Sequence, residues 1–487
     1  MGTPSDSGLR EQVAVWFRPA VFLGHNAITL LGAILTTSSA LTLLFFWALL
    51  ILRGGPVHPY TGIIFFLILP GFFVAGLVLM PLGVVWRRAR LRKAGSLPTV
   101  YPKIDLREPV LRRAAGFVLG LSIANMTILG TASYQGVEYM DTVQFCGQTC
   151  HTVMQPEFTA YERSPHQRVA CVECHIGPGA SFFVRSKLSG VRQVFAVSFR
   201  TYSTPIPSPV ENLRPARETC EQCHWPERFS GDKLEVIPKF GDDEKNTATK
   251  TVLLMHIGGR NLDRKLVGIH GAHLGLVTYI PADRKRQTSP WVSHRNADGA
   301  TTDFASTDTP PSRDLLSQGE RRTMDCMDCH NRPSHVFYLP ERAVDREMAA
   351  GRIDASLPFI HKVAVELLKR TYASRSSAEI QIPEDLREYY RKNYFNVYNS
   401  RRAQVEQAAQ ALVYVYDGNV FPAMGVTWGT YPNNLGHADF PGCFRCHDGN
   451  HKSSDGKEIT QDCNTCHSLL AMEEEKPKIL QELYGGN

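Results

Sequence analysis

The sequence predicts three transmembrane helices near the N-terminus, followed by a mostly α-helical or irregular domain with a small β insert. Two observations predict this architecture. Three long apolar runs occupy the first 134 residues, and six short cysteine-and-histidine motifs are spread over the rest of the chain. With 487 residues, the chain is long enough for more than one domain.

The three apolar runs cover residues 26–52, 62–86 and 114–133. Each approaches or exceeds the ~20 residues that a helix needs to cross a bilayer. The first run is too long for the apolar region of a cleaved signal peptide, which indicates an anchor. The third run contains Asn125 and Thr127, and a cleaved or interfacial segment is its alternative interpretation. We therefore expect residues 1–134 to form a transmembrane anchor in the lipid bilayer.

Charge is distributed unevenly along the chain. The net charge of +6 comes from the first 134 residues, and the remainder is slightly acidic. The basic residues gather in the segment 87–113, between the second and third apolar runs. Such loops stay in the cytoplasm, so everything after the third run is expected on the outer face of a bacterial inner membrane, in the periplasm. Topology accounts for the basic excess, and we expect no nucleic-acid partner.

One motif recurs six times in the outward part: two cysteines, with a histidine directly after the second. The first copy is one residue longer than the others, as Cys146-Gly-Gln-Thr-Cys150-His151. The five regular copies are Cys171-Val-Glu-Cys174-His175, Cys220-Glu-Gln-Cys223-His224, Cys326-Met-Asp-Cys329-His330, Cys443-Phe-Arg-Cys446-His447 and Cys463-Asn-Thr-Cys466-His467.

The motif is the attachment signature of c-type haem. Its two thiols form thioethers to the haem, and its histidine ligates the iron. Zinc is the alternative because it also binds Cys-x-x-Cys pairs, but zinc does not require a histidine after every second cysteine. All 12 cysteines of the chain fall within the six copies. We therefore predict six covalently bound haems c, and a multihaem cytochrome anchored in the membrane.

Three regions are expected after the anchor. Residues 135–232 form a domain with three haems. Residues 233–320 form the small β insert, with strands at 234–237, 251–255 and 274–280, and a loop at 297–317. Residues 321–487 form a C-terminal domain with three haems and helices over 341–371 and 384–414. Haems placed so densely must lie close together, and a row of close haems conducts electrons.

The stretch 145–224 resembles the NapC/NirT family of membrane-anchored, quinol-oxidising multihaem cytochromes. The resemblance rests on Cys146-Gly-Gln-Thr-Cys150-His151-Thr-Val-Met154, on Ser164-Pro-His166 and on Arg185-Ser-Lys187. The whole chain looks more like longer inner-membrane versions in bacteria with extracellular electron transfer, which share a segment like Phe440-Pro-Gly-Cys443-Phe-Arg-Cys446-His447-Asp-Gly-Asn-His451. The chain departs from the four-haem members in its six motifs and two further membrane helices.

The second axial ligands of the irons must come mostly from histidines outside the motifs. We expect this role for six residues: His166, His256, His270, His335, His437 and His451. His273 is the substitute for His270, and His361 is expected to face solvent in a helix. The resemblance suggests Met154 for the first haem, and a methionine packed beside the ring is the alternative.

The resemblance implies quinol oxidation where the membrane surface meets the first haem, with menaquinol or ubiquinol as substrate. Lys187 matches the basic residue of the family, and Arg185 lies two positions before it. The family pairs such a lysine with a carboxylate. Ser189 stands where we would expect that acid, so Glu138 or Asp141 is expected to accept protons instead. The alternative for all four charged residues is interfacial solvation.

The predicted function is therefore an inner-membrane quinol dehydrogenase that passes electrons to a periplasmic cytochrome or reductase. One alternative is a relay subunit that takes electrons from a partner membrane protein. A second is a terminal reductase, which would need a haem with an open axial position, often with an unusual proximal ligand. All six motifs end in histidine, which argues against that second alternative.

Overall fold

Two compact units, Met1–Thr142 and Val143–Asn487, make up the chain in this computed structural model. Each unit is considered by itself. The structure describes residues 18–19, 21–53, 68–101, 109–149, 151–177, 180–210, 213–225, 231–260 and 266–485.

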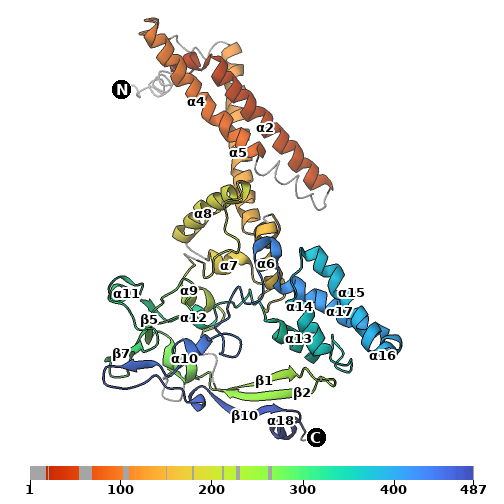
Figure 1. The fold of residues 1–487 in the computed structure, drawn as a ribbon. Helices are drawn as coiled ribbons and strands as arrows, with labels where there is room; N and C mark the ends of the chain where they lie inside the picture. Colours follow the sequence, from red (N-terminus) through yellow and green to blue (C-terminus); the bar gives the residue numbers. More distant parts are fainter. Residues whose placement is uncertain are drawn as a thin grey trace. The chain divides into compact units, whose positions relative to one another are not determined.

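Three long helices form the first unit (Figure 1): α2 (Ala27–Arg53), α4 (Leu69–Lys93) and α5 (Pro109–Met140). Among the described residues, two helical segments are long and apolar enough to cross a membrane, Ala27–Phe46 and Leu69–Lys93. They correspond to the first and second apolar runs. The third run lies within α5, which is not one of these two, so the third membrane span stays a prediction.

Small residues bring α2 and α4 into close contact. A Cβ atom added to Gly32 would lie 2.7 Å from the carbonyl oxygen of Gly76, so neither helix can bear a larger side chain there. The hydroxyl of Thr29 donates to the carbonyl of Met80 at 3.2 Å. Helices in membranes associate through such small and hydroxyl-bearing residues. Ile128 of α5 joins the same unit by packing into a cluster with Ala40, Leu43 and Phe73.

The second unit contains two regions, which we call the helical region (residues 340–419) and the haem region (the rest of 143–485). Short elements carry the motifs in the haem region. The first motif spans the π-helix η2 (Phe145–Thr149) and the start of α6 (His151–Glu162). The others begin on α7 (Cys171–His175), α9 (Ala216–Cys220), α12 (Cys326–Cys329), and the 3₁₀ turns η5 (Gly442–Arg445) and η6 (Cys463–Thr465). Four other helices are α8 (Ala180–Ser198), α10 (Gly268–His273), α11 (Arg313–Gln318) and α18 (Lys478–Tyr484), and η4 (Pro422–Met424) is a further 3₁₀ turn.

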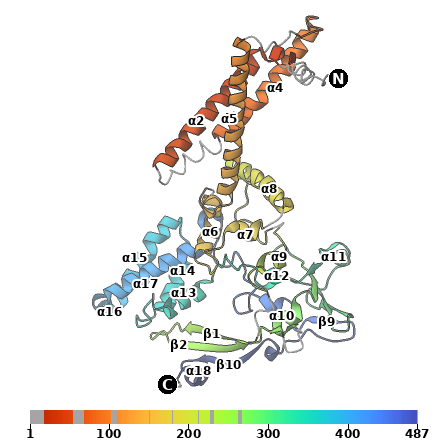
Figure 2. The same cartoon turned by 180° about the vertical axis from the view of Figure 1, so that it is seen from behind.

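Two antiparallel sheets join segments that are distant in sequence (Figure 2). One has the order β1-β2-β10, in which β10 begins with His467 of the sixth motif and pairs with β2. The other has the order β8-β5-β6-β7-β9. The strands of these two sheets are β1 (Lys233–Phe240), β2 (Ala248–Met255), β5 (Val277–Ile280), β6 (Trp291–Arg295), β7 (Thr301–Ser306), β8 (Arg322–Thr323), β9 (His451–Ser453) and β10 (His467–Glu474). A two-stranded pair is formed by β3 (Gly259–Arg260) and β4 (Leu266–Val267).

These sheets differ from the small insert that the sequence predicts. The expected loop at 297–317 contains β7, which pairs with β6. The C-terminal segment supplies β9, which follows the fifth motif, and β10, which begins with the histidine of the sixth, so both sheets are completed only by these late residues. The spaced apolar residues of the insert alone gave no sign of these partners, because a strand pattern does not reveal which distant strand it pairs with.

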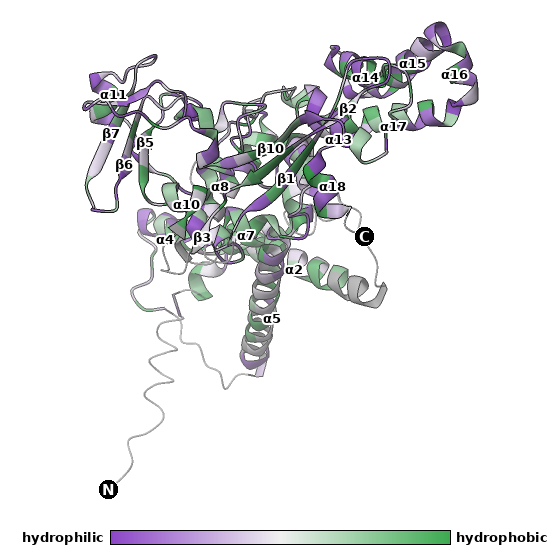
Figure 3. Cartoon of the chain, turned by 90° about the horizontal axis from the view of Figure 1, so that it is seen from below, coloured by the Kyte–Doolittle hydropathy of each residue, from purple (hydrophilic) through white to green (hydrophobic). Residues whose placement is uncertain are grey.

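The helical region consists of α13 (Pro340–Ala349), α14 (Ile360–Lys369), α15 (Arg375–Asn393), α16 (Phe395–Ser400) and α17 (Arg402–Asn419). Its core includes Leu368, Leu386, Tyr390 and Leu412, all fully buried. Hydrophobic and hydrophilic residues both occur along α15 (Figure 3), as expected for a helix with one buried face, here formed by residues such as Ile382 and Leu386. The helix predicted over 341–371 is two helices, because the chain turns at Gly351, where φ is +71°.

His361 differs from its predicted solvent-facing position. Its side chain is buried, and its Nδ1 lies 2.7 Å from a carboxylate oxygen of Asp242. Its Nε2 lies 3.4 Å from an oxygen of Asp345. The apolar spacing of α14 put His361 beside the core, and two distant carboxylates make this burial tolerable.

Candidate haem-binding centres

Five motif histidines each face the ring of a second histidine in the haem region. The ring centroids of these pairs lie 5.8–6.5 Å apart. The pairs are His175 with His335 at 6.3 Å, His224 with His166 at 5.9 Å, His330 with His270 at 6.5 Å, His447 with His273 at 5.8 Å, and His467 with His437 at 6.2 Å.

These distances fit one metal ion held between two imidazoles. Metal–imidazole bonds of about 2 Å put the two ligating nitrogens roughly 4 Å apart, and the rings themselves extend the centroid distance to about 6 Å. In each pair, one histidine directly follows the second cysteine of a motif. The donor set of each pair therefore fits a haem that is attached through the cysteines and ligated on both faces.

Backbone carbonyls orient several of these rings. The Nδ1 atoms of His335, His273 and His447 donate to the carbonyl oxygens of Glu157 (2.9 Å), Ile269 (2.7 Å) and Thr460 (2.7 Å). A donating Nδ1 leaves Nε2 without a proton and able to bind a metal, and such partners are usual around metal-ligating histidines.

Burial favours the neutral, metal-binding form of six of the paired histidines. It lowers the pKa of the imidazoles, because a charged ring is poorly solvated inside the protein. The affected residues are His175, His270, His273, His330, His335 and His467. Burial also raises the pKa of the Cys329 thiol to about 12 and that of Cys446 to about 11.

Two of the histidines predicted as axial ligands are engaged otherwise. His451 is almost fully buried, with Nδ1 2.8 Å from Asp448 and Nε2 2.7 Å from the carbonyl oxygen of Ser289. His256 has Nδ1 3.1 Å from Asp232 and Nε2 3.1 Å from Ser468. With both ring nitrogens occupied, neither histidine fits the expected role of an iron ligand.

His273, expected only as a substitute for His270, takes a position of its own opposite His447. It lies on α10, three residues after His270. The spacing of three residues on a helix was the available signal, because it puts both rings on one side. A single short helix thus faces two motifs, the fourth with His270 and the fifth with His273.

The first motif is accommodated by a π-helical turn. Its extra residue falls in η2, and a π-helix holds one more residue per turn than an α-helix. Gly147 has no room for a side chain there, because the ring of Phe158 packs directly over it. Cys150 and the side chain of His151 lie outside the described residues. Met154 is half-buried on α6, one turn after His151.

Consecutive motifs are neighbours in space. The thiol of Cys171 hydrogen-bonds with Cys146 of the first motif, and the thiol of Cys220 with Cys326 of the fourth. Cys174 of the second motif and Cys223 of the third lie close enough for their charges to interact, which links these two pairs of motifs. The later motifs continue it, through the pairs Cys329–Cys443 and Cys443–Cys466. The six motifs therefore form one series in sequence order.

The residues proposed from sequence for quinol lie in both units. Glu138 is exposed near the end of α5, and Asp141 follows that helix. Arg185 is exposed on α8, and the backbone of Lys187 belongs to the same helix. The side chain of Lys187 lies outside the described parts of the chain. The hydroxyl of Ser189 accepts a hydrogen bond from Gln193 at 3.3 Å.

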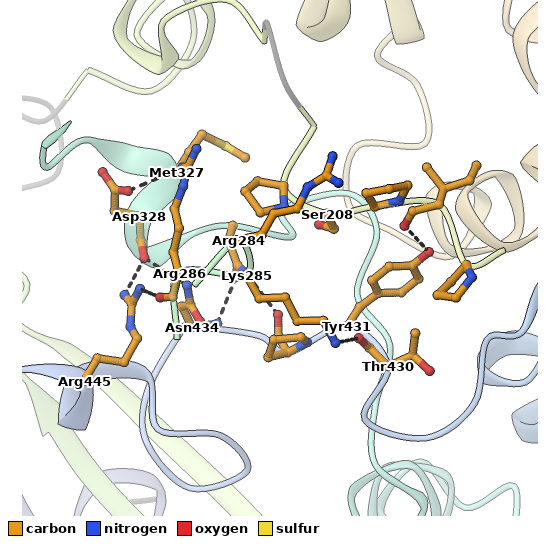
Figure 4. A pocket seen from close by; sticks show the side chains of 16 residues that line it. Ser208, Arg284, Lys285, Arg286, Met327, Asp328, Thr430, Tyr431, Asn434 and Arg445 are labelled. Carbon is orange, nitrogen blue, oxygen red and sulfur yellow. Dashed lines mark hydrogen bonds and ion pairs between the residues drawn. The ribbon is translucent and has the colours of Figure 1, made fainter. Parts of the chain in front are cut away.

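A cavity of about 180 Å³ adjoins the fourth motif (Figure 4). Its wall includes Asp328, which lies between the two cysteines of that motif and is almost fully buried. The carboxylate of Asp328 accepts a hydrogen bond from the hydroxyl of Tyr279 at 2.5 Å and lies 3.8 Å from Arg286. Sequence reasoning missed this residue, because the variable positions of a Cys-x-x-Cys-His motif give no sign of burial.

Known proteins resemble the chain in its N-terminal part and over most of its length. A model of the NapC/NirT cytochrome c family, N-terminal region, matches residues 109–207. The cytochrome c-type protein ImcH of Geobacter sulfurreducens is 43% identical over 453 residues, which cover 92% of this chain and 89% of that protein. The cytochrome c-type protein NrfH of Wolinella succinogenes is 26% identical over 110 residues, 22% of this chain and 61% of that protein. No solved structure matches the chain.

Proposed function

Because the chain belongs to the NapC/NirT family of c-type cytochromes, we propose that it is an inner-membrane quinol dehydrogenase with six haems c. Electrons pass from membrane quinol through the haems to a periplasmic cytochrome or reductase. The observation that carries this proposal is the series of five facing histidine pairs, whose motifs adjoin one another in sequence order. A single continuous series suits conduction from one end to the other.

Each haem is held by the two cysteines and the histidine of one motif. We assign the second axial ligands from the facing pairs: His335 to the second haem, His166 to the third, His270 to the fourth, His273 to the fifth and His437 to the sixth. Met154 is the candidate for the first haem. When bound, each haem iron takes up and releases one electron. Five of the six haems would then have a histidine on each face and no open position for a substrate, which argues against a terminal reductase.

Quinol is oxidised at the start of the series, near the first haem. Only a short segment separates Met140, at the end of α5, from Cys146, so the first motif closely follows the helix that contains the third apolar run. Oxidation of one quinol to quinone releases two electrons and two protons. Lys187 and Arg185 steady the quinol oxygen by their charge, and Glu138 or Asp141 accepts the protons.

Membrane topology is part of the same proposal. The basic segment 87–113 lies in the cytoplasm, as expected from the distribution of positive charge in membrane proteins. The last turn of α4 contributes Arg90, Arg92 and Lys93 to it. The haem region is then periplasmic, and protons from quinol are released outward.

Reduction of the purified protein by a quinol analogue tests this function. The absorbance bands of reduced haem should appear on addition of the analogue, and dithionite should then give the fully reduced spectrum. Lys187→Ala should slow reduction by the analogue at least tenfold without changing reduction by dithionite. Arg192→Ala is the matched control, because Arg192 is an exposed basic residue on the same helix.

Two results would contradict the proposal. A wild-type protein that the analogue never reduces would favour the relay subunit, which takes electrons from a partner protein. Equal rates for Lys187→Ala and the wild type would remove Lys187 from the quinol site while leaving the haem assignments in place.

A further inference from the structure

A buried ion pair lies beside His335, the residue assigned as second ligand of the second haem. Arg332 places its Nη2 3.1 and 3.0 Å from the two carboxylate oxygens of Glu157. The side chain of Arg332 is 7% exposed and that of Glu157 15%. Glu157 belongs to α6, the helix that begins with His151 of the first motif, whereas Arg332 follows the fourth motif. Two distant segments therefore meet at this pair.

The pair is joined to the ring of His335. The Nδ1 of His335 donates to the backbone carbonyl of Glu157 at 2.9 Å, and the carboxylate Oε2 of Glu157 lies 3.3 Å from the same nitrogen. The centroid of the same ring lies 6.3 Å from that of His175. The negative charge of Glu157 is thus separated from the metal position by little more than one imidazole ring.

Arg332 is fixed in place by several further contacts. Its Nε donates to the carbonyl oxygen of His335 at 2.7 Å, and its Nη1 to the hydroxyl of Ser208 at 3.3 Å. Its guanidinium also lies over the rings of Phe337 and Tyr431, 5.1 and 4.4 Å from their centroids. Arg332 therefore holds the carboxylate of Glu157 in one position.

Burying such a pair brings no reliable gain in stability. The cost of removing two charges from water can exceed their mutual attraction, and apolar pairs of similar size often do as well. Charge close to a metal centre has another effect, because an electron added to the metal is repelled by a nearby negative charge. A carboxylate at the outer nitrogen of a ligating imidazole also makes that imidazole a stronger electron donor to the metal.

We propose that Glu157 lowers the reduction potential of the second haem through His335, and that Arg332 positions Glu157 for this role. This inference rests on the assignment of His175 and His335 to one iron in the proposed function. Reduction adds one electron to that iron and converts it from ferric to ferrous. Both effects of the Glu157 carboxylate favour the ferric form, and the positive charge of Arg332 opposes them. Removing the charge of Glu157 alone leaves Arg332 unbalanced, so the potential should rise.

A redox titration of the haem-loaded protein, followed by its visible absorbance with small-molecule mediators, tests the inference. The titration curve is a sum of one-electron transitions, one component for each haem. In Glu157→Gln, the midpoint potential of one component should be higher than in the wild type. We expect a change of about tenfold in its ferric–ferrous equilibrium, which is about 59 mV for one electron. His335→Ala should turn the same iron high-spin, which identifies that component as the second haem. The other components should stay in place.

Two further variants separate charge from position. Glu157→Asp keeps the negative charge and should restore most of the wild-type potential. Glu162→Gln makes the same charge change at an exposed position of the same helix, where water screens it, and should leave every component unmoved. The electron paramagnetic resonance spectrum of Glu157→Gln should stay fully low-spin, because the backbone carbonyl of residue 157 still accepts from His335.

An unmoved component in a low-spin Glu157→Gln protein would overturn the inference. A high-spin iron in that variant would also overturn it, because the carboxylate would then hold the ligand rather than tune the metal. The titration uses mediators and needs no quinol. Failure of the quinol dehydrogenase function would appear instead as a wild-type protein that quinol does not reduce.

Discussion

The helical region and the haem region of the second unit bury their residues in different ways. In the helical region, five helices share one large apolar cluster, in which residues such as Leu386 and Leu412 are fully buried. The haem region has smaller clusters. One consists of Val277, Tyr279, Val292 and Met324, and the motif cysteines Cys329 and Cys446 pack against it. The first region forms its core almost entirely from its own side chains, joined by Phe240 of β1, whereas the second gathers its short elements around the attachment sites.

This difference indicates which interactions stabilise each region. A helix bundle with a continuous apolar core can fold from side chains alone. Short helices and 3₁₀ turns of three to five residues cannot, because helices of this length are not stable without tertiary contacts. In the proposed function, the haem rings supply those contacts. The two regions should therefore respond differently to haem loss, core mutation, ligand mutation and pH.

Loss of haem should have the largest effect. Protein produced without haem attachment should have an unfolded haem region and a folded helical region, because only the latter keeps its core. Limited proteolysis followed by mass spectrometry should give a resistant fragment close to residues 340–419. The haem-loaded protein is the control and should resist cleavage throughout. Uniform digestion of the protein without haem would show that both regions depend on the haems.

Truncation of the helical core should have the next largest effect. Leu412→Ala should lower the free energy of unfolding of the helical region by about 2–5 kcal/mol, the usual cost of a cavity at a buried leucine. Urea unfolding followed by far-ultraviolet circular dichroism measures it. Ile380→Ala is the control, because Ile380 of α15 is 72% exposed and its loss should change stability by less than about 0.5 kcal/mol. Unfolding of the haem region can be followed separately by haem absorbance. If Leu412→Ala lowers the free energy of unfolding measured in this way by the same amount, the two regions unfold together.

Two histidines that flank the fifth motif should behave oppositely. His437 faces His467, so His437→Ala should leave one iron high-spin with little loss of folded protein. His451 is buried between Asp448 and Ser289, so His451→Ala should keep all irons low-spin. It should also lower stability by roughly 1–3 kcal/mol through lost buried hydrogen bonds. Electron paramagnetic resonance and urea unfolding distinguish the two outcomes. A high-spin iron in His451→Ala would restore His451 as a ligand.

The contrast between His437 and His451 also shows how much of the site can be predicted from the sequence. The motif cysteines and histidines follow from spacing alone, because attachment of one haem requires them to be adjacent in the chain. The second ligands come from elsewhere: His335 is far in sequence from His175, and the structure brings them together. Counting histidines could not show that His451 and His256 have other hydrogen-bond partners, because those partners are also distant in sequence.

The fold was predictable to a similar extent. Apolar runs and helical periodicity indicated where the long helices lie, because these patterns are local. They did not indicate where helices break, since the helix predicted over 384–414 is divided among α15, α16 and α17. The pairing of β10 with β2 joins the last strand of the chain to an early one, and no local pattern carries that information. Buried charges such as Glu157, Arg332 and Asp345 were missed for the same reason, because a charged residue is expected at the surface unless its distant partner is known.

A change of pH should have the smallest effect, and it should be confined to the helical region. Burial opposes the charged form of His361, but hydrogen bonds to Asp345 and Asp242 outweigh it and raise the pKa of His361 above its usual value. Protonated His361 thus stabilises the fold below the pKa of an unfolded histidine, about 6.5. This stability is lost as the pH rises through the raised value of the folded protein. The urea concentration at the midpoint of unfolding of the helical region should therefore decrease as the pH is raised from 6 to 9.

His361→Gln should flatten this dependence, because glutamine keeps a polar group in place but has no proton to lose. Lys362→Gln, next to it on α14 and exposed, is the control and should keep the wild-type slope. If the midpoint of the wild type instead rises with pH over this range, His361 is neutral in the folded protein. The contact between α14 and the turn after β1 would then be held by neutral hydrogen bonds rather than by charge.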